Sequence, residues 1–265
     1  MFRQRVATAI VLIAVIGATV FFARPVVFQG LVLLAVLFAL AEYNRLALSH
    51  LRFYRLTALL SGMLVGTVQT WPVPWMPIDL LLILLTFLVA VLYLWRTTIM
   101  EGYVERLALA MFGSLYIALS LPYLGRMRLL PHGQAMIVMT LTMVALSDTA
   151  AYVVGKTLGR RKFASMASPN KTMEGFYASF VGSMIAVLLT RWFLWRDMPI
   201  WPALGLGVVI GMVGPFGDLI ESAIKRGAHV KDSGSILPGH GGVLDRSDAY
   251  LFSAPVVYYA VQWFF

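Results

Sequence analysis

The stretch SAIKRGAHVKDSGSILPGHGGVLDRSD, residues 222–248, is the most informative part of the chain. It gathers charged side chains and a histidine around a glycine-rich turn, in a chain that is otherwise mostly apolar. Carboxylates hold hard divalent cations, lysine and arginine neutralise phosphate oxygens, and glycine lets backbone N–H groups approach an anion closely. The stretch therefore predicts phosphate and metal chemistry rather than an ordinary solvated loop. Its polar residues of interest are Lys225, Arg226, Lys231, Asp232, His240, Asp245, Arg246 and Asp248.

The composition around this stretch is that of a multi-pass membrane protein. The 265 residues are 60% hydrophobic and only 12% charged, far outside the range of soluble domains. Because the chain has no cysteine, disulfides and thiolate metal sites are excluded, and a metal must be held by oxygen or imidazole. The net charge of +9 could indicate nucleic-acid binding, but the basic residues gather on one side of the predicted topology. We therefore expect no nucleic-acid partner.

The apolar runs predict an all-α, polytopic membrane fold of about nine transmembrane helices, with a cytoplasm-facing polar cavity in the C-terminal half. The basic start of the first run resembles a signal peptide, but its length and the further runs favour an uncleaved helix. Between the second and third runs, residues 44–55 form a short basic amphipathic segment that is expected to lie at the lipid headgroups. The runs lie at about residues 6–23, 25–43, 56–70, 78–95, 107–124, 134–155, 173–195, 202–224 and 248–265.

These runs divide into three groups along the chain. Residues 1–77 hold helices one to three, residues 78–133 hold helices four and five, and residues 134–265 hold the four helices of a catalytic group. In the eighth run, several glycines and Pro215 predict a bend or break where neighbouring helices or a cavity can satisfy the freed backbone groups.

The distribution of lysine and arginine predicts the orientation in the membrane. With the N-terminus inside, nine crossings put 16 of the 21 basic residues in cytoplasmic segments and five outside. Two basic loops, residues 156–171 and 225–248, then face the cytoplasm, where nucleoside triphosphates occur. We expect an inner (plasma) membrane protein whose N-terminus and active site are cytoplasmic and whose C-terminus is outside.

Four acidic side chains lie inside apolar runs or at their ends. An ionised carboxylate is costly in hydrocarbon, so each should face a polar cavity or a basic partner. An alternative interpretation is a set of ion pairs that only join helices, such as Asp218 with Lys225 or Asp245 with Arg246. The four acidic residues are Glu42, Asp148, Asp218 and Glu221.

Helical spacing collects acidic groups on two faces. Asp245 and Asp248 are separated by three residues at the start of the ninth run, and therefore lie on one face. Asp218 belongs to a similar face on the eighth run. We predict that Asp218, Asp245 and Asp248 bind one or two Mg²⁺ ions, with a second, monovalent cation as an open alternative. The polar face of the eighth run, at i, i+3, i+4 and i+7, consists of Asp218, Glu221, Ser222 and Lys225.

The first basic loop ends in Ser-Pro-Asn-Lys-Thr-Met-Glu-Gly, residues 168–175, which is a turn followed by a helix start. Thr172 is the expected N-cap of that helix. Lys171, next to a helix N-terminus, suits a phosphate group. Taken alone, the loop is explained equally well by capping with an incidental lysine.

Residues 222–248 resemble the signature of the phosphatidate cytidylyltransferases, also called CDP-diacylglycerol synthases. The shared pattern is Ser, Lys-Arg, four residues, Lys-Asp, then Pro-x-His-Gly-Gly and Asp-Arg-x-Asp. Residues 147–152 (SDTAAY) and 168–175 resemble upstream segments of the same family, whereas residues 1–130 match only in hydropathy. Ser247 departs mildly from the apolar residue or threonine expected between Arg246 and Asp248.

The resemblance implies an Mg²⁺-assisted reaction. The phosphate of phosphatidate attacks the α-phosphorus of CTP, pyrophosphate leaves, and CDP-diacylglycerol remains in the bilayer. Because a phosphomonoester is already ionised near neutral pH, alignment and charge neutralisation suffice for catalysis. The implied catalytic residues are Asp218, Lys225, Arg226, Lys231, Asp232, His240, Asp245, Arg246 and Asp248; the implied substrate-binding residues are Asp148, Lys171, Ser222, Gly239, Gly241 and Gly242.

The two substrates should use different basic groups. We expect Lys231 and Arg246 to serve the triphosphate of CTP, and Lys171 and Arg226 to serve phosphatidate. Two rival functions stay open, as does a homodimer. A CTP-dependent polyprenol or dolichol kinase would use similar helices and metals, and an ion-coupled transporter would also place acids at broken helices.

The orientation can be tested with reporter fusions at Phe265. We expect a reporter at this C-terminus to lie outside the cytoplasm, because an odd number of crossings starts from a cytoplasmic N-terminus. A reporter that is active in the cytoplasm would contradict both the number of crossings and the orientation.

Overall fold

The computed structural model describes residues 2–49, 51–98, 100–163, 168–239 and 241–265. These ranges form an all-α fold, which confirms the predicted fold class. They hold nine helical segments when α5, a π-helical turn η1 and α6 are counted as one. The elements are α1 (Phe2–Phe21), α2 (Pro25–Ala47), α3 (Arg52–Thr70), α4 (Ile78–Arg96), α5 (Tyr103–Gly113), η1 (Ser114–Ala118), α6 (Tyr123–Met127), α7 (Gly133–Thr157), α8 (Met173–Phe193), α9 (Ile200–Gly227) and α10 (Leu244–Phe264).

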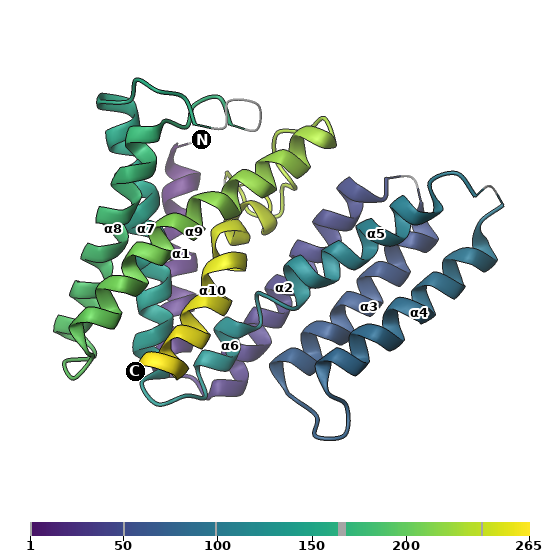
Figure 1. The fold of residues 1–265 in the computed structure, drawn as a ribbon, viewed down its shortest axis with the longest axis horizontal. Coiled ribbons are helices and arrows are strands. Elements are labelled where there is room, and N and C mark those ends of the chain that lie inside the picture. The colour runs from purple at the N-terminus through teal and green to yellow at the C-terminus, as the bar shows by residue number, and fades with distance from the viewer. Residues whose placement is uncertain (1, 50, 99, 164–167, 240) are drawn as a thin grey trace.

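Six of the described segments are long and apolar enough to cross a membrane: α2, α4, the unit Tyr103–Met127, α7, α8 and α9. A polytopic membrane protein is therefore supported, whereas nine crossings stay a prediction. The ends of the chain lie at opposite ends of the helices (Figure 1), as an odd number of crossings requires.

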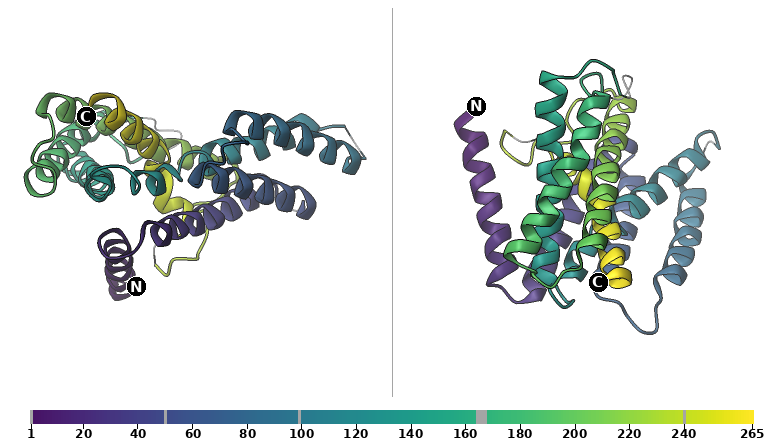
Figure 2. Two further views of the ribbon diagram at one scale, coloured as in Figure 1. Left: turned by 90° about the horizontal axis from the view of Figure 1, so that it is seen from below. Right: turned by 60° about the vertical axis from the view of Figure 1, so that its left-hand side comes forward.

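The helices form two groups joined by α2 and α6. Helices α7, α8, α9 and α10 pack together with α1 alongside, while α3, α4 and α5 splay away as a second group (Figures 1 and 2). A continuous buried core runs from α2 through η1 and α7 to α10, and includes Val36, Ile117, Met136 and Val257. The predicted site residues that the structure describes all belong to the group of α7, α8, α9 and α10 or to its loops.

The predicted amphipathic segment, residues 44–55, is divided between the end of α2 and the start of α3, and its place at the lipid headgroups stays a prediction. Helix α2 continues to Ala47, and α3 begins at Arg52 after a short turn. Leu48 in this turn is only 1% exposed and belongs to a small core with Tyr54 and Tyr93. The apolar residues Leu48 and Tyr54 of this segment are therefore buried in the protein.

Helix α9 is not broken at Pro215 but continues to Gly227. Proline has no N–H, so the carbonyl of Gly211 loses its usual partner within the helix. The Ser179 hydroxyl of α8 donates a hydrogen bond to the Gly211 carbonyl at 2.5 Å. A neighbouring helix thus satisfies the freed backbone group, and α9 can carry its polar face onward without interruption.

Candidate functional site

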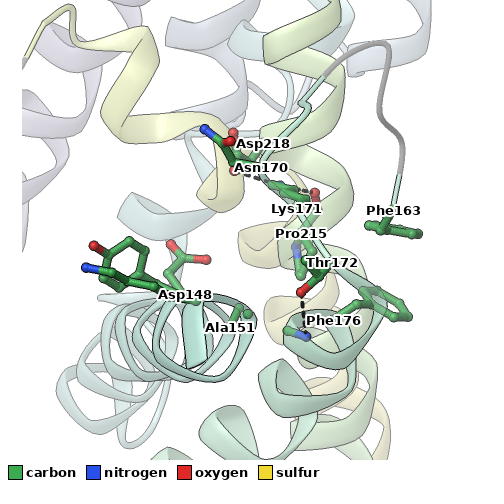
Figure 3. Close-up of a pocket in the computed structure, with 13 residues that line it drawn as sticks. Asp148, Ala151, Phe163, Asn170, Lys171, Thr172, Phe176, Pro215 and Asp218 are labelled. Atoms are coloured by element: carbon green, nitrogen blue, oxygen red, sulfur yellow. Dashed lines mark hydrogen bonds and ion pairs between the residues drawn. The ribbon is translucent and has the colours of Figure 1, made fainter. Parts of the chain in front are cut away.

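A cavity of about 530 Å³ opens among α7, α8, α9 and the loop before α8. Asp148 and Ala151 of α7 line one wall, and Pro215 and Asp218 of α9 line another (Figure 3). Lys171 reaches the cavity from the loop. The lining therefore combines carboxylates and lysine side chains with apolar surface, and we call it the polar cavity.

Lys171 is held in place by the start of α8. The Thr172 hydroxyl accepts a hydrogen bond from the Gly175 N–H at 3.2 Å, which confirms the predicted N-cap. The adjacent Lys171 ammonium lies 2.7 Å from Asp218 Oδ2 and donates to the Pro215 carbonyl at 3.1 Å (Figure 3). The cap thus directs a cation toward the carboxylate at the edge of the cavity.

Three carboxylates converge beside this ion pair, from Asp218 and Glu221 of α9 and Asp248 of α10. One oxygen of each lies within 4.8 Å of the others. Helix α10 approaches α9 closely at Gly217, where a Cβ atom would lie 2.6 Å from the Asp248 carbonyl oxygen. Carboxylate oxygens are the ligands that Mg²⁺ prefers, so the donor set fits this ion. We call these three residues the acidic cluster.

Lys225 lies between a member of the acidic cluster and a second carboxylate. Its ammonium is 2.5 Å from Glu221 Oε2, an ion pair without hydrogen-bond geometry, and 2.7 Å from Asp245 Oδ1. The other oxygen of Asp245 accepts the N–H groups of Ser233 at 2.9 Å and Gly242 at 2.8 Å. Asp245 therefore holds the glycine-rich loop and Lys225 in this structure.

The observed acidic cluster shares Asp218 and Asp248 with the predicted metal site and differs in its third member. Glu221 takes the place where the sequence suggested Asp245, whose role as a metal ligand stays a prediction. The spacing of three residues places Glu221 on the same helix face as Asp218, and this spacing was the sequence signal that could have identified Glu221 as a member of the cluster. Ion pairs that join these elements are present, as in the alternative considered above, with Asp218 paired to Lys171 and Lys225 paired to Glu221 and Asp245.

The remaining predicted residues lie around this centre. The Ser222 hydroxyl contacts Asp218 Oδ1 at 3.4 Å. Gly239 and Gly241 adopt left-handed backbone conformations, with φ of 75° and 85°, that favour glycine. His240 lies outside the described residues. Four charged residues are exposed on the last turn of α9, the following loop and the first turn of α10: Arg226, Lys231, Asp232 and Arg246.

A second hollow, of about 300 Å³, is almost entirely apolar and lies between α1, α2, α7 and α10. Its wall includes Ile16 of α1, Phe28 of α2 and Ile137 of α7. Arg246, Ser247 and Tyr250 of α10 also line it. An apolar hollow with a basic residue in its lining is suited to an amphiphile with an anionic headgroup. We call it the apolar groove.

The profile of the cytidylyltransferase family matches residues 3–264. The chain belongs to the cytidylyltransferase family. The phosphatidate cytidylyltransferase of Staphylococcus aureus (strain COL) is 33% identical over 257 residues, which are 93% of this chain and 95% of the relative. That of Synechocystis sp. is 44% identical over 133 residues, which cover 49% of this chain and 44% of the relative. The predicted family and enzyme class, a nucleotidyltransferase, are confirmed, and the match includes the helices before α7.

The acidic cluster predicts how single substitutions change metal binding. Substituting a residue that only orients a metal ligand typically weakens metal binding by about 10–100-fold. Loss of a direct ligand should therefore weaken binding by at least ~100-fold. We expect this loss of Mn²⁺ affinity for Asp218→Asn, Glu221→Gln and Asp248→Asn, measured by electron paramagnetic resonance on purified protein. Normal affinity in Glu221→Gln together with weak binding in Asp245→Asn would instead support the ligand set predicted from the sequence.

Proposed function

We propose that this chain transfers the cytidylyl group of CTP to phosphatidate at the polar cavity and the acidic cluster. The family match and the nearly full-length relatives named phosphatidate cytidylyltransferase support this reaction. An oxygen of the lipid phosphate forms a bond to the α-phosphorus of CTP while the bond to the β-phosphate oxygen breaks. Pyrophosphate leaves, and CDP-diacylglycerol stays in the membrane.

The arrangement of charges carries the assignment of the site. Lys171 and Asp218 both line the polar cavity and form an ion pair. Asp218 also belongs to the acidic cluster. A triphosphate bound beside Lys171 would therefore reach the cluster without leaving the cavity. When bound, Mg²⁺ held by Asp218, Glu221 and Asp248 would neutralise charge on the phosphates.

The chain's own residues supply alignment rather than a strong base. A phosphomonoester is mostly ionised at neutral pH, so the attacking oxygen needs no proton acceptor of high basicity. The Lys171 ammonium, fixed by Asp218 and the Pro215 carbonyl, would contact phosphate oxygens of the nucleotide. Exclusion of water by the apolar lining of the cavity would strengthen these contacts.

The lipid substrate fits the apolar groove. An acyl chain would lie among the side chains of α1, α2 and α7, and the phosphate would be near Arg246 of α10. This assignment reverses the partition that the sequence suggested, in which Lys171 served phosphatidate and Arg246 served CTP. The reason is their surroundings, since Lys171 lines the polar cavity whereas Arg246 lines the apolar groove.

We also propose that the mouth of the polar cavity faces the cytoplasm. Lys156, in the last turn of α7, and Lys171, in the loop that follows, line that cavity, and the excess of basic residues places this part of the chain inside. CTP would then arrive from the water phase while phosphatidate arrives from the bilayer.

The transferred group is tested by labelling CTP in its α- or γ-phosphate. We expect purified protein with phosphatidate and Mg²⁺ to move the α-label into the lipid fraction and to release the γ-label as pyrophosphate. Transfer of the γ-label to lipid would identify a lipid kinase instead.

The partition of substrates is tested by Michaelis constants. Lys171→Met removes a charged phosphate contact, so the KM for CTP should rise by roughly 10-fold or more, with a smaller change for phosphatidate. Arg246→Gln should raise the KM for phosphatidate more than that for CTP. Lys162→Met, an exposed lysine of the same loop as Lys171, is the matched control and should leave both constants unchanged. The opposite pattern in the two variants would restore the partition predicted from the sequence.

A further inference from the structure

Glu42 of α2 has no role in the reaction described above, yet it is only 1% exposed and reaches the start of α10. Its Oε1 accepts a hydrogen bond from the Val243 N–H at 3.1 Å, and its Oε2 accepts from the Leu244 N–H at 2.9 Å. Oε2 also accepts from the Ser233 hydroxyl at 3.0 Å. One buried carboxylate thus has three donors, all from a segment about 200 residues away in the sequence.

These contacts satisfy a requirement of α10. The first N–H groups of any helix have no acceptor within the helix, and the helix N-terminus carries partial positive charge. Val243, the residue before α10, makes no side-chain capping hydrogen bond. Glu42 supplies the missing acceptor and a compensating negative charge from a different helix. It therefore acts as an N-cap in trans.

The glycine-rich loop is shaped to admit this carboxylate. For a Cβ atom built on Gly234, the three nearest heavy atoms all belong to the Glu42 side chain, and Oε1 and Cδ, the latter at 2.7 Å, would be too close for a real contact. A Cβ atom on Gly242 would likewise overlap with Glu42 Oε2 and the Ser233 hydroxyl. Two glycines thus leave the space that Glu42 fills, so the loop and the carboxylate fit each other closely.

The first turn of α10 carries the residues that the proposed reaction needs. Asp245 binds the Ser233 and Gly242 N–H groups, so it holds the same loop from the side of α10. Asp248, one turn later, completes the acidic cluster with two residues of α9. Any shift or rotation of this turn would move Asp248 relative to α9.

We propose that Glu42 is a positioning residue that fixes the first turn of α10, and thereby places Asp248 in the acidic cluster. This inference rests on the proposed metal site. It gives α2, which lies outside the predicted catalytic helices, a direct part in building that site. The charge of Glu42 is essential in this role, because it faces backbone donors at a helix N-terminus in a buried environment.

The first experiment compares Glu42→Gln with Glu42→Asp. Glutamine keeps the size of the side chain but removes its charge, and its NH₂ group faces donors instead of acceptors. Mn²⁺ affinity should therefore fall by about 10–100-fold, as it does when residues that orient metal ligands are substituted. Hydrogen exchange of the Gly242, Val243 and Leu244 amides should become faster even without metal. Glu42→Asp keeps the charge and should recover part of both losses.

The second experiment uses the fit between Glu42 and the loop. Gly234→Ala alone should weaken Mn²⁺ binding, because the added methyl group displaces the Glu42 carboxylate. In the Glu42→Ala background the obstructing side chain is gone, so adding Gly234→Ala should cause little further loss. Equal losses from Gly234→Ala in both backgrounds would overturn the proposed coupling.

Gln29→Leu provides the control on the same helix, since Gln29 is also buried, at 2% exposed, but binds Trp71. We expect this variant to keep wild-type Mn²⁺ affinity and loop exchange, whatever its thermal stability. A folded Glu42→Gln protein with wild-type affinity and exchange would refute the role of Glu42. If instead Asp218→Asn and Asp248→Asn bound Mn²⁺ normally, the metal assignment would fail, while loop exchange would still test Glu42.

Discussion

The structure depends on compensating several carboxylates that lie among apolar helices. A buried charge without a partner is costly, and removing one partner of a buried ion pair typically destabilises a protein by about 3–5 kcal/mol. Here Lys225 compensates Glu221 and Asp245, whose side chains are buried. Lys171 compensates Asp218 in a partly exposed ion pair, which is worth less. These lysines come from α9 itself and from the loop before α8, so the ion pairs also fix that loop against the bundle.

Compensation within the described residues is incomplete at the acidic cluster. Asp248 Oδ1 accepts the N–H of its neighbour Ala249 at 2.8 Å, and the two carboxylate oxygens of Glu221 are buried without a hydrogen-bond partner among the described residues. Lys225 is shared between two carboxylates. Three carboxylates this close repel one another, and their ionised forms are stabilised by an added cation. The repulsion between the carboxylates destabilises the empty cluster. The same concentration of negative charge makes it suitable for Mg²⁺ beside a bound triphosphate.

Much of the fold followed from local patterns in the sequence. Apolar runs located the helices, and the turn before Met173 correctly indicated the Thr172 cap, because both depend on neighbouring residues. The faces holding Asp218 and Asp248 followed from helical spacing alone. Partner choice did not follow, since whether Lys225 contacts Asp218 or Asp245 depends on how α9 packs against α10. The same is true of Glu42, whose donors are distant in sequence, and of Leu48, which shares a buried cluster with Tyr93 of α4.

The first turns of α10 explain how one helix can serve a water-soluble and a lipid substrate together. Successive residues of an α-helix point about 100° apart, so residues three apart share a face and adjacent residues do not. Asp245 and Asp248 therefore face α9 and its lysine, whereas Arg246 and Tyr250 line the apolar groove. In the proposed reaction the lipid phosphate and the nucleotide would meet across this turn. The distance between them would then depend on how rigidly the start of α10 is held, which explains why its N–H groups are anchored to a buried carboxylate of α2 rather than to water.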